Sequence, residues 1–583
     1  MFFNEEDLKE IEKQRKEWEE KVLKKQLARF GVTESPQKFY TPLDVKDLDF
    51  LKEVGFPGQY PYTAGKYASL PPGAAPAVGG GHAAAGGGLV RAGRYAGYGT
   101  AEDTRDYYKF MIARGQVPGV NLAFDLPTQC GYDSDAPEAR GEVGKTGVAI
   151  DTLRDFEVLY EPFVGNADLD KINSAWTINP MANIILAMYI ALAKKRGIPI
   201  SKLNCTPQND ILKECVSRGT HIFPLKHAMR MTRDTIVFGA KEMPELRPVS
   251  INGHHPREAG ASRELVLGFH LASGIAYIQL GVDAGLDIDV CGPRITFNDS
   301  SGSMEMFKEI AYLRAARRMW AKIMKERFGA KDPRTMIYRD IGGCMMGFDS
   351  ATKQRPLNNL IRSVIGGVAE ALSGYVPTCQ PPFDEPLGLG HSMEAIQLEL
   401  DAARIIMFES RLCDVADPLA GSYYVEHLTN ELEEAGWKII KQIDDMGGIV
   451  AAIESGWADR EIAECAYAKQ KAIETGGQVV VGVNKFTGEG ELEISINRMV
   501  PNPYDPEKRA RAEERQIANL NKVRKERDNK AVKTALKRVK EAAQDENANV
   551  IPPLVEAVDA YASIGEITNV LKEVFGTYQE PEL

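Results

Sequence analysis

The sequence has few of the residues that mark disulfide-rich or metal-binding chains. Its eight cysteines are scattered over 583 residues, and no two of them have the spacing Cys-x-x-Cys. In a chain of this length, scattered cysteines favour reduced thiols over a disulfide framework or a zinc site. We therefore expect a cytoplasmic protein that has no protein-bound metal centre.

Long apolar runs and an excess of basic residues are also missing. No apolar stretch reads as long enough to cross a bilayer, and the acidic amino terminus does not resemble a signal peptide. The net charge of −11 argues against non-specific binding to nucleic acid, which needs a basic surface. A chain of 583 residues exceeds what one hydrophobic core usually holds. We expect a multidomain enzyme with neither membrane nor nucleic acid as a partner.

From about residue 119 onward, short apolar segments alternate with longer helical ones. Seven segments read as strands, each followed by a helical stretch, and they are residues 120–126, 172–178, 202–206, 248–251, 293–297, 335–338 and 374–378. An eighth strand is possible near 411–425. Repeated strand–helix units predict an α/β fold with a parallel sheet. A closed (β/α)8 TIM barrel fits this pattern best, and a doubly wound open sheet is the alternative.

Helical segments are predicted on both sides of the barrel. A charged helix from Asn4 to Phe30 lies either on the surface or on another subunit. The predicted domains are an N-terminal helical arm (1–45), the (β/α)8 barrel (46–430), a helical segment packing on the barrel (431–500) and a helical C-terminal linker or extension (501–583).

Polar side chains follow the predicted strands. They are Asp125, Asn179, Gln208, His254 with His255, Asn298 with Asp299, Arg339 with Asp340, and Gln380. One polar strand end could be a helix cap, but seven of seven indicate a shared polar mouth. The carboxyl ends of the strands are where (β/α)8 enzymes build their active sites. Small polar residues inside the strands, such as Ser174 and Thr296, would leave room along the barrel axis.

Several stretches, in the same order, resemble signature segments of one enzyme family. They include Tyr95-Ala-Gly-Tyr-Gly-Thr-Ala-Glu, Ala123-Phe-Asp-Leu-Pro-Thr-Gln-Cys-Gly-Tyr-Asp-Ser-Asp, Gln208-Asn-Asp-Ile-Leu-Lys-Glu and Asp417-Pro-Leu-Ala-Gly-Ser-Tyr-Tyr-Val-Glu. With them the chain resembles the adenosylcobalamin-dependent acyl-CoA mutases, the methylmalonyl-CoA mutase family, from about Pro57 to its carboxyl terminus. The resemblance implies a barrel that holds the pantetheine arm of coenzyme A along its axis. It also implies a radical 1,2-migration of the thioester group, which interconverts branched and linear acyl-CoA thioesters.

Cobalamin binding in this family relies on the motif Asp-x-His-x-x-Gly, whose histidine coordinates cobalt. The motif is absent from the sequence, and no further α/β pattern follows residue 500. The resemblance therefore implies a large, substrate-binding subunit, with adenosylcobalamin bound mainly by a separate small subunit. We expect an acyl-CoA substrate, and an assembly that is a dimer of large subunits or a heterotetramer.

The resemblance also assigns candidate site residues. His255, which follows His254, corresponds to a histidine that donates a hydrogen bond to the thioester carbonyl. Tyr95 corresponds to a tyrosine beside the adenosyl group, and Arg218 to an arginine whose planar fork binds a carboxylate. The other substrate contacts are Gln208, Asn121, Arg294 and Thr296. Without the family, Arg218 would more often be a solvated helix residue, and His255 would as often be a capping or core histidine.

The chain departs from the family pattern around the expected pocket. His254 replaces a tyrosine, Ala64 replaces an arginine, residues 339–346 lack a His-Thr-Gln motif, and an Ala/Gly-rich tract (71–88) replaces a coenzyme A-contacting segment. Glycine and proline disfavour regular structure, so we expect this tract to be a loop. The replacements imply a roomier or differently shaped pocket.

The substrate is expected to carry a free carboxylate, because Tyr95 and Arg218 are both retained. The expected function is interconversion of methylmalonyl/succinyl-CoA or of a bulkier substituted succinyl-CoA. One alternative is an isobutyryl- or 2-hydroxyisobutyryl-CoA-type mutase subunit. The other is a non-catalytic barrel subunit of a mutase heteromer, an idea favoured by the loss of the tyrosine before His255.

Overall fold

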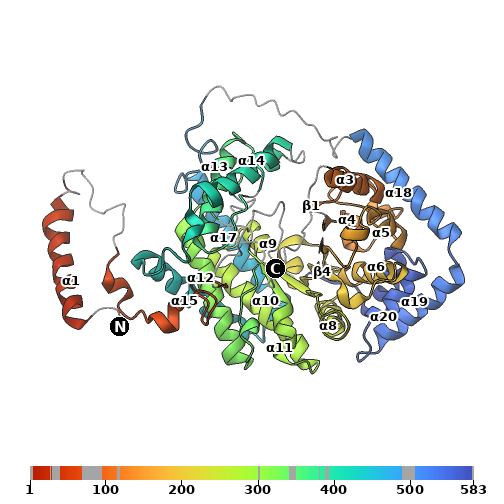
Figure 1. The fold of residues 1–583 in the computed structure, drawn as a ribbon, viewed down its shortest axis with the longest axis horizontal. Coiled ribbons are helices and arrows are strands. Elements are labelled where there is room, and N and C mark those ends of the chain that lie inside the picture. The colour runs from red at the N-terminus through yellow and green to blue at the C-terminus, as the bar shows by residue number, and fades with distance from the viewer. Residues whose placement is uncertain are drawn as a thin grey trace.

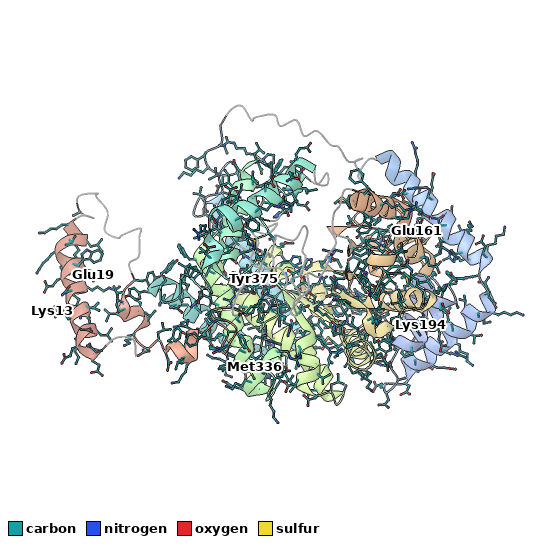
Figure 2. The ribbon with its side chains drawn as sticks, in the orientation of Figure 1. Lys13, Glu19, Glu161, Lys194, Met336 and Tyr375 are labelled. Carbon is teal, nitrogen blue, oxygen red and sulfur yellow. The ribbon has the colours of Figure 1, made fainter. Side chains whose placement is uncertain are left out.

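The computed structural model describes residues 4–25, 28, 40–67, 95–113, 119–299, 303–340, 350–379, 381–387, 393–488 and 506–580. The Ala/Gly-rich tract 71–88, Gln380 and residues 341–346 therefore lie outside the described residues. Helices surround short central strands, and α1 (Glu5–Trp18) stands apart from this body (Figure 1). Figure 2 places Tyr375 near the middle of the body and Lys13 and Glu19 on the separate arm.

The strands are parallel and hydrogen-bonded in the order in which they occur in the sequence. One sheet has the order β1 (Tyr95–Ala96), β2 (Val120–Ala123), β3 (Asn173–Thr177), β4 (Asn204–Pro207), and a second pairs β5 (Val249–Asn252) with β6 (Ile295–Asn298). Two backbone bonds join the sheets, since Arg247 N donates to Cys205 O (3.0 Å) and Ser250 N donates to Gln208 O (2.9 Å). Beyond β6, Phe297 N donates to Arg339 O (3.0 Å). The predicted parallel α/β fold is thus confirmed. A doubly wound sheet reverses its strand order at a switch point, and this order does not reverse.

Two of the predicted strands are wrong. Residues 335–338 begin at the last residue of a 3-10 turn, η10 (Pro333–Thr335), and form no ladder. Among the described residues, this segment reaches the sheet through a single bridge, between Phe297 and Asp340. Residues 374–378 follow the end of α13 (Asn358–Leu372) at Gly374, whose φ is +80°, and form no ladder. The possible strand at 411–425 contains η13 (Leu412–Asp414) and the start of α15 (Tyr423–Asp445). Within the described residues, the strands therefore do not close into a barrel.

The helices that follow the strands supply most of the core. They are α3 (Ala101–Ala113), α4 (Leu126–Cys130), α5 (Leu153–Leu159), α6 (Ala182–Lys195), α8 (Leu225–Glu242), α10 (Arg263–Asp283), α11 (Ile288–Cys291) and α12 (Met306–Lys322). α10 and α12 both pack against α15. α10 has the length and apolar composition of a membrane span, contrary to the expectation that no segment does, but 78% of its apolar window is buried inside the protein. A core helix passes the same test.

Residues 5–25 and 28 of the predicted amino-terminal helix are helical, as expected. The side chain of Asn4 caps it by accepting a hydrogen bond from Asp7 N (2.8 Å), and after Trp18 the backbone continues as a π-helix, η1 (Glu19–Leu23). Arg15 contacts Asp44 (3.4 Å) in η2 (Pro42–Val45). This ion pair connects the arm to the segment that leads into the body.

The carboxyl-terminal helices cover the side of the body that contains β1 to β4 (Figure 1). They are α18 (Pro506–Glu526), α19 (Asn529–Gln544), α20 (Ile551–Asp559) and α21 (Ile564–Phe575), and they follow α14 (Met393–Arg404), α16 (Ile449–Glu454) and α17 (Trp457–Glu474). α20 packs along α6, and α19 packs on both α20 and α21. Asp133, in the loop after α4, accepts hydrogen bonds from Ser563 Oγ (2.7 Å) and Gly565 N (2.7 Å) at the start of α21.

Candidate functional site

The polar residues that follow β3 and β4 form one buried hydrogen-bonded cluster. Gln208 Oε1 accepts hydrogen bonds from Asn179 Nδ2 (2.9 Å) and Lys213 Nζ (2.8 Å). Asn179 Oδ1 accepts a further bond from Asp210 N (2.9 Å). An ammonium group can only donate, so the amide oxygen of Gln208 faces Lys213 and its Nε2 group points elsewhere. Gln208 is therefore held with an amide donor available to a ligand.

Charged side chains crowd together just after β4. Lys213 ends α7 (Ile211–Lys213), and its Nζ lies 2.5 Å from Glu214 Oε1, with both side chains buried. Glu214 also accepts hydrogen bonds from Asn179 and Thr220. Burial alone would raise the pKa of Glu214, but Lys213 and Arg218 outweigh it and lower that pKa. Glu214 is thus an ionised carboxylate whose partners are already in place.

Arg218 is the cation of this group whose anion, Glu214, lies too far away for a hydrogen bond. It ends η7 (Glu214–Arg218), and its Nη1 lies 3.8 Å from Glu214, beyond hydrogen-bond distance. Nη1 is buried and has no hydrogen-bond partner among the residues described. A buried polar atom without a partner costs free energy, so a ligand group that hydrogen-bonds to Nη1 would be stabilised here. With two cations and one carboxylate in Lys213, Glu214 and Arg218, that group is expected to be an anion.

His254 and His255 open α9 (His254–Glu258), directly after β5. The turn is anchored on both sides, because Asp210 accepts a hydrogen bond from Asn252 N (2.7 Å) and Gly253 N donates to Asn298 O (3.0 Å). The two imidazole rings lie 3.7 Å apart, and His254 Nδ1 approaches Glu258 at 3.5 Å.

His255 is a neutral imidazole. Its pKa lies well below the usual value because of burial first, and then because of the positive charges of His254, Lys213 and Arg218. Its Nδ1 is buried without a hydrogen-bond partner among the described residues. A neutral imidazole has one N–H, so Nε2 can donate a hydrogen bond while Nδ1 stays unprotonated.

The remaining predicted residues are spread along the strands. Asn121 in β2 pairs with Tyr95 of β1 in the ladder, and the side chain of Tyr95 lies outside the described residues. Thr296 in β6 is buried and its hydroxyl donates to Val249 O (3.2 Å). Arg294 precedes β6 and donates to Gly239 O (2.7 Å) and Met243 O (3.2 Å) at the end of α8. The structure therefore places Gln208, Arg218, His254 and His255 at one end of the strands and Arg294 at the other.

Lys213, Glu214 and Thr220 take part in this site but were not predicted from the sequence. The available signal was an adjacent Lys-Glu pair that directly follows the apolar Ile211-Leu212. Opposite charges in a short buried helix imply mutual pairing, since neither tolerates burial alone. Within the described part of the chain, no group of three or more His, Cys, Asp or Glu side chains could hold a metal ion.

Comparison with known proteins gives consistent matches over nearly the whole chain. The family described as methylmalonyl-CoA mutase matches residues 33–577. The 2-hydroxyisobutanoyl-CoA mutase large subunit of Aquincola tertiaricarbonis is 38% identical over 550 residues, which are 93% of this chain and 91% of that protein. The methylmalonyl-CoA mutase of Escherichia coli K12 is 39% identical over 540 residues, 92% of this chain and 70% of that protein. The human mitochondrial methylmalonyl-CoA mutase is 37% identical over 490 residues, and the match spans 62% of its length.

Proposed function

Because the chain belongs to the methylmalonyl-CoA mutase family and is an acyl-CoA mutase, we propose that its substrate is a carboxylated acyl-CoA thioester. The chain is an isomerase and a large subunit of a cobalamin-dependent enzyme. The proposed substrates are methylmalonyl/succinyl-CoA or a succinyl-CoA with a bulkier substituent. The buried Nη1 of Arg218, which no described residue hydrogen-bonds, is the observation that carries this proposal.

The reacting end of the substrate would lie between Arg218, Gln208 and His255. Arg218 takes the carboxylate through its planar fork, where the neighbouring Lys213 is already neutralised by Glu214. His255 donates an Nε2–H hydrogen bond to the thioester oxygen, and its lowered pKa keeps it a neutral donor instead of an acid. Gln208 adds a second donor and is oriented by Lys213. These contacts hold the migrating group and exclude water from it.

The rest of coenzyme A would extend along the strands toward Arg294. A four-residue strand such as β6 is about 13 Å long. Arg294 lies at the amino end of this strand, and His255 lies at the carboxyl end of its neighbour β5. A thioester with a long pantetheine arm spans such a distance. We propose that the strands close into a (β/α)8 barrel around this arm, with residues beyond β6 completing the wall.

Adenosylcobalamin, when bound, supplies the radical that removes a hydrogen atom from the substrate. The cobalt-binding motif Asp-x-His-x-x-Gly is absent from the sequence, and the described residues offer no metal-ligand cluster. We propose that a separate small subunit binds the cofactor and docks over the His254–His255 end of the strands. The assembly would be a dimer of large subunits or a heterotetramer in the cytoplasm.

Two other functions remain as alternatives. A 2-hydroxyisobutyryl-type mutase is favoured by the 38% identity to the Aquincola tertiaricarbonis subunit, of which the match covers 91%. Arg218, whose buried Nη1 has no hydrogen-bond partner among the described residues, opposes it, since that substrate has no free carboxylate. A non-catalytic subunit is opposed by the intact set of Gln208, Arg218 and His255.

A reconstituted assay tests the proposal. The chain is mixed with its small subunit, adenosylcobalamin and a panel of acyl-CoA thioesters, and isomers are separated by mass-resolved chromatography. Conversion of a branched dicarboxylic acyl-CoA to its linear isomer is the expected result. Conversion of 2-hydroxyisobutyryl-CoA alone would establish the first alternative. No conversion by an assembled complex would establish the second.

A further inference from the structure

A buried ion pair lies beneath the turn that presents His255. His270 comes from α10 and Asp299 follows β6, and His270 Nδ1 lies 2.7 Å from Asp299 Oδ1. Only 1% and 0% of the two side chains are exposed. Neither residue is one of the side chains proposed to bind the substrate, which are Gln208, Arg218 and His255. A buried ion pair destabilises a fold unless each partner makes further hydrogen bonds. The hydrogen-bond partners of His270 and Asp299 therefore identify the elements that this ion pair holds in place.

Both members of the pair are saturated with partners. Asp299 Oδ1 accepts a hydrogen bond from Tyr312 (2.7 Å), and Oδ2 accepts one from Tyr338. Burial alone would raise the pKa of Asp299 and lower that of His270, but their mutual attraction outweighs burial and reverses both shifts. The imidazolium and the carboxylate are therefore both charged. The hydroxyl groups of Tyr312 and Tyr338 hold the Asp299 carboxylate in place.

The pair reaches the turn at two points. His270 Nε2 donates to Ile251 O (2.9 Å) near the end of β5. At Gly253, a Cβ atom would lie 2.6 Å from Asp299 Oδ1 and 3.0 Å from His270 Nδ1. Gly253 has φ −76°, which any residue can adopt, so glycine is needed here for room and not for backbone freedom. The turn thus rests directly on the ion pair, one and two residues before His254 and His255.

We infer that His270 and Asp299 are positioning residues for His255. The pair sets the height and orientation of the Gly253 turn, and through it the direction of the His255 imidazole. The inference rests on the proposed role of His255 as hydrogen-bond donor to the thioester. A purely structural ion pair would stabilise the fold and leave the geometry of His255 unaffected.

The first test is kinetic and uses the reconstituted holoenzyme. Asp299→Asn keeps the shape but removes the charge, and His270→Gln keeps one amide donor. We expect kcat to fall about 10- to 100-fold with KM changed by less than about twofold, because a small displacement of a catalytic donor costs mainly the chemical step. Glu426→Gln is the matched control. It breaks a buried pair with Arg314 (2.5 Å), in which neither side chain hydrogen-bonds to the Gly253 turn, and it should leave kcat unchanged.

The second test does not depend on activity. Acylation of His255 by diethylpyrocarbonate is followed by peptide mass mapping of the folded large chain. We expect the rate to change at least about threefold in Asp299→Asn or His270→Gln and to stay at the wild-type value in Glu426→Gln, since reactivity follows the exposure of the neutral imidazole. Gly253→Ala, which pushes a methyl group against Asp299, should change the rate in the same way and serves if the other variants do not fold.

The two readouts separate the inference from the proposed function. A changed acylation rate with unchanged kcat supports positioning and contradicts the role of His255 in the reaction. An unchanged acylation rate in folded Asp299→Asn and Gly253→Ala overturns the inference, whatever happens to kcat.

Discussion

At the scale of single residues, the guanidinium of Arg218, whose Nη1 lacks a hydrogen bond within the described structure, carries the most specific consequence. Arg218→Gln removes the charge that would pair with a substrate carboxylate but keeps a hydrogen-bond donor. For a dicarboxylic acyl-CoA we expect KM to rise about 10- to 100-fold, in line with the loss of a charged hydrogen bond. Steady-state kinetics on the reconstituted enzyme measures this. Unchanged KM would rule out a carboxylate contact at Arg218.

His255 is expected to act on the reaction step and not on binding. His255→Ala removes the donor to the thioester oxygen, and kcat should fall about 10²-fold, as when one oxyanion donor is deleted. Because the pKa of His255 is already far below neutral, wild-type kcat should show no titration of this residue between pH 6 and pH 9. A kcat–pH profile with a histidine-like rise in this range would contradict the neutral-donor mechanism.

Only part of this site could be predicted from the sequence. Gln208, Arg218 and His255 were found because strand ends and a family resemblance point to them. The close pairing of Lys213 with Glu214, which leaves Arg218 beyond hydrogen-bond distance of that carboxylate, depends on distances of a few ångströms in folded space. The ion pair of His270 with Asp299 likewise joins a helix to a strand end 29 residues later, and although Asp299 was predicted as a polar strand end, no local pattern pointed to His270.

At the scale of secondary-structure elements, α13 shows why a predicted strand fails to form. Glu370 in α13 accepts hydrogen bonds from Thr378 N (2.7 Å) and Thr378 Oγ1 (3.1 Å). The backbone donor that a strand at 374–378 would need is thus used by a side chain. The apolar composition of residues 374–378 predicted an extended strand. Composition does not indicate which group will accept the hydrogen bond of a backbone N–H.

Glu370 also makes stability depend on pH. Burial raises the pKa of its carboxyl from 4.5 to about 8, so the folded state keeps a proton that the unfolded state loses. Its contribution to stability is complete below pH 4.5 and is lost as pH rises through 8. Glu370→Gln should therefore raise the free energy of unfolding at pH 9 relative to wild type, with little change at pH 5.

Urea denaturation of the chain at the two pH values measures this effect. Glu394→Gln, on the exposed surface of α14, is the control and should change stability equally at both. An equal effect of Glu370→Gln at pH 5 and pH 9 would show that its carboxyl titrates normally.

At the scale of the whole molecule, the carboxyl-terminal helices are fastened to the body by many side chains and by the packing of α20 along α6. Asp133 is one of them and bonds to Ser563, Gly565 and Arg524 (2.6 Å). Asp133→Ala removes three hydrogen bonds, although Ser563 keeps Glu566 and Arg524 keeps Asp135 as acceptors, and we expect the chain to lose about 1–3 kcal/mol of stability. Hydrogen exchange in α21 should accelerate before exchange in α10 does.

Arg538→Ala provides the comparison for this prediction. It breaks an exposed ion pair with Glu556 in the same helices, and exposed pairs contribute little. Exchange in α21 should therefore stay at its wild-type rate in Arg538→Ala. Equal acceleration in both variants would show that the extension is held by its apolar face and not by Asp133.

The family, the parallel α/β fold and the mutase activity were predicted correctly from the sequence. Repeated strand–helix units dictate a parallel sheet, and the strand order follows from short right-handed connections. Closure of the sheet was also predicted, but among the described residues the segment after β6 reaches the sheet through a single bridge, between Phe297 and Asp340. Whether a short polar segment pairs with a distant strand depends on the side chains that pack between the two. Those packing contacts cannot be predicted from the residues of the segment alone.

The placement of Arg294 and His255 at opposite ends of the strands has a consequence for the order of events in turnover. Coenzyme A thioesters would enter and leave through the amino-end opening, while the cofactor-bearing subunit covers the other. Products can then depart without uncapping the reactive radical site, so many cycles proceed on one docked complex. Subunit exchange and substrate exchange become kinetically independent, and excess acyl-CoA should not strip the cobalamin protein from its partner.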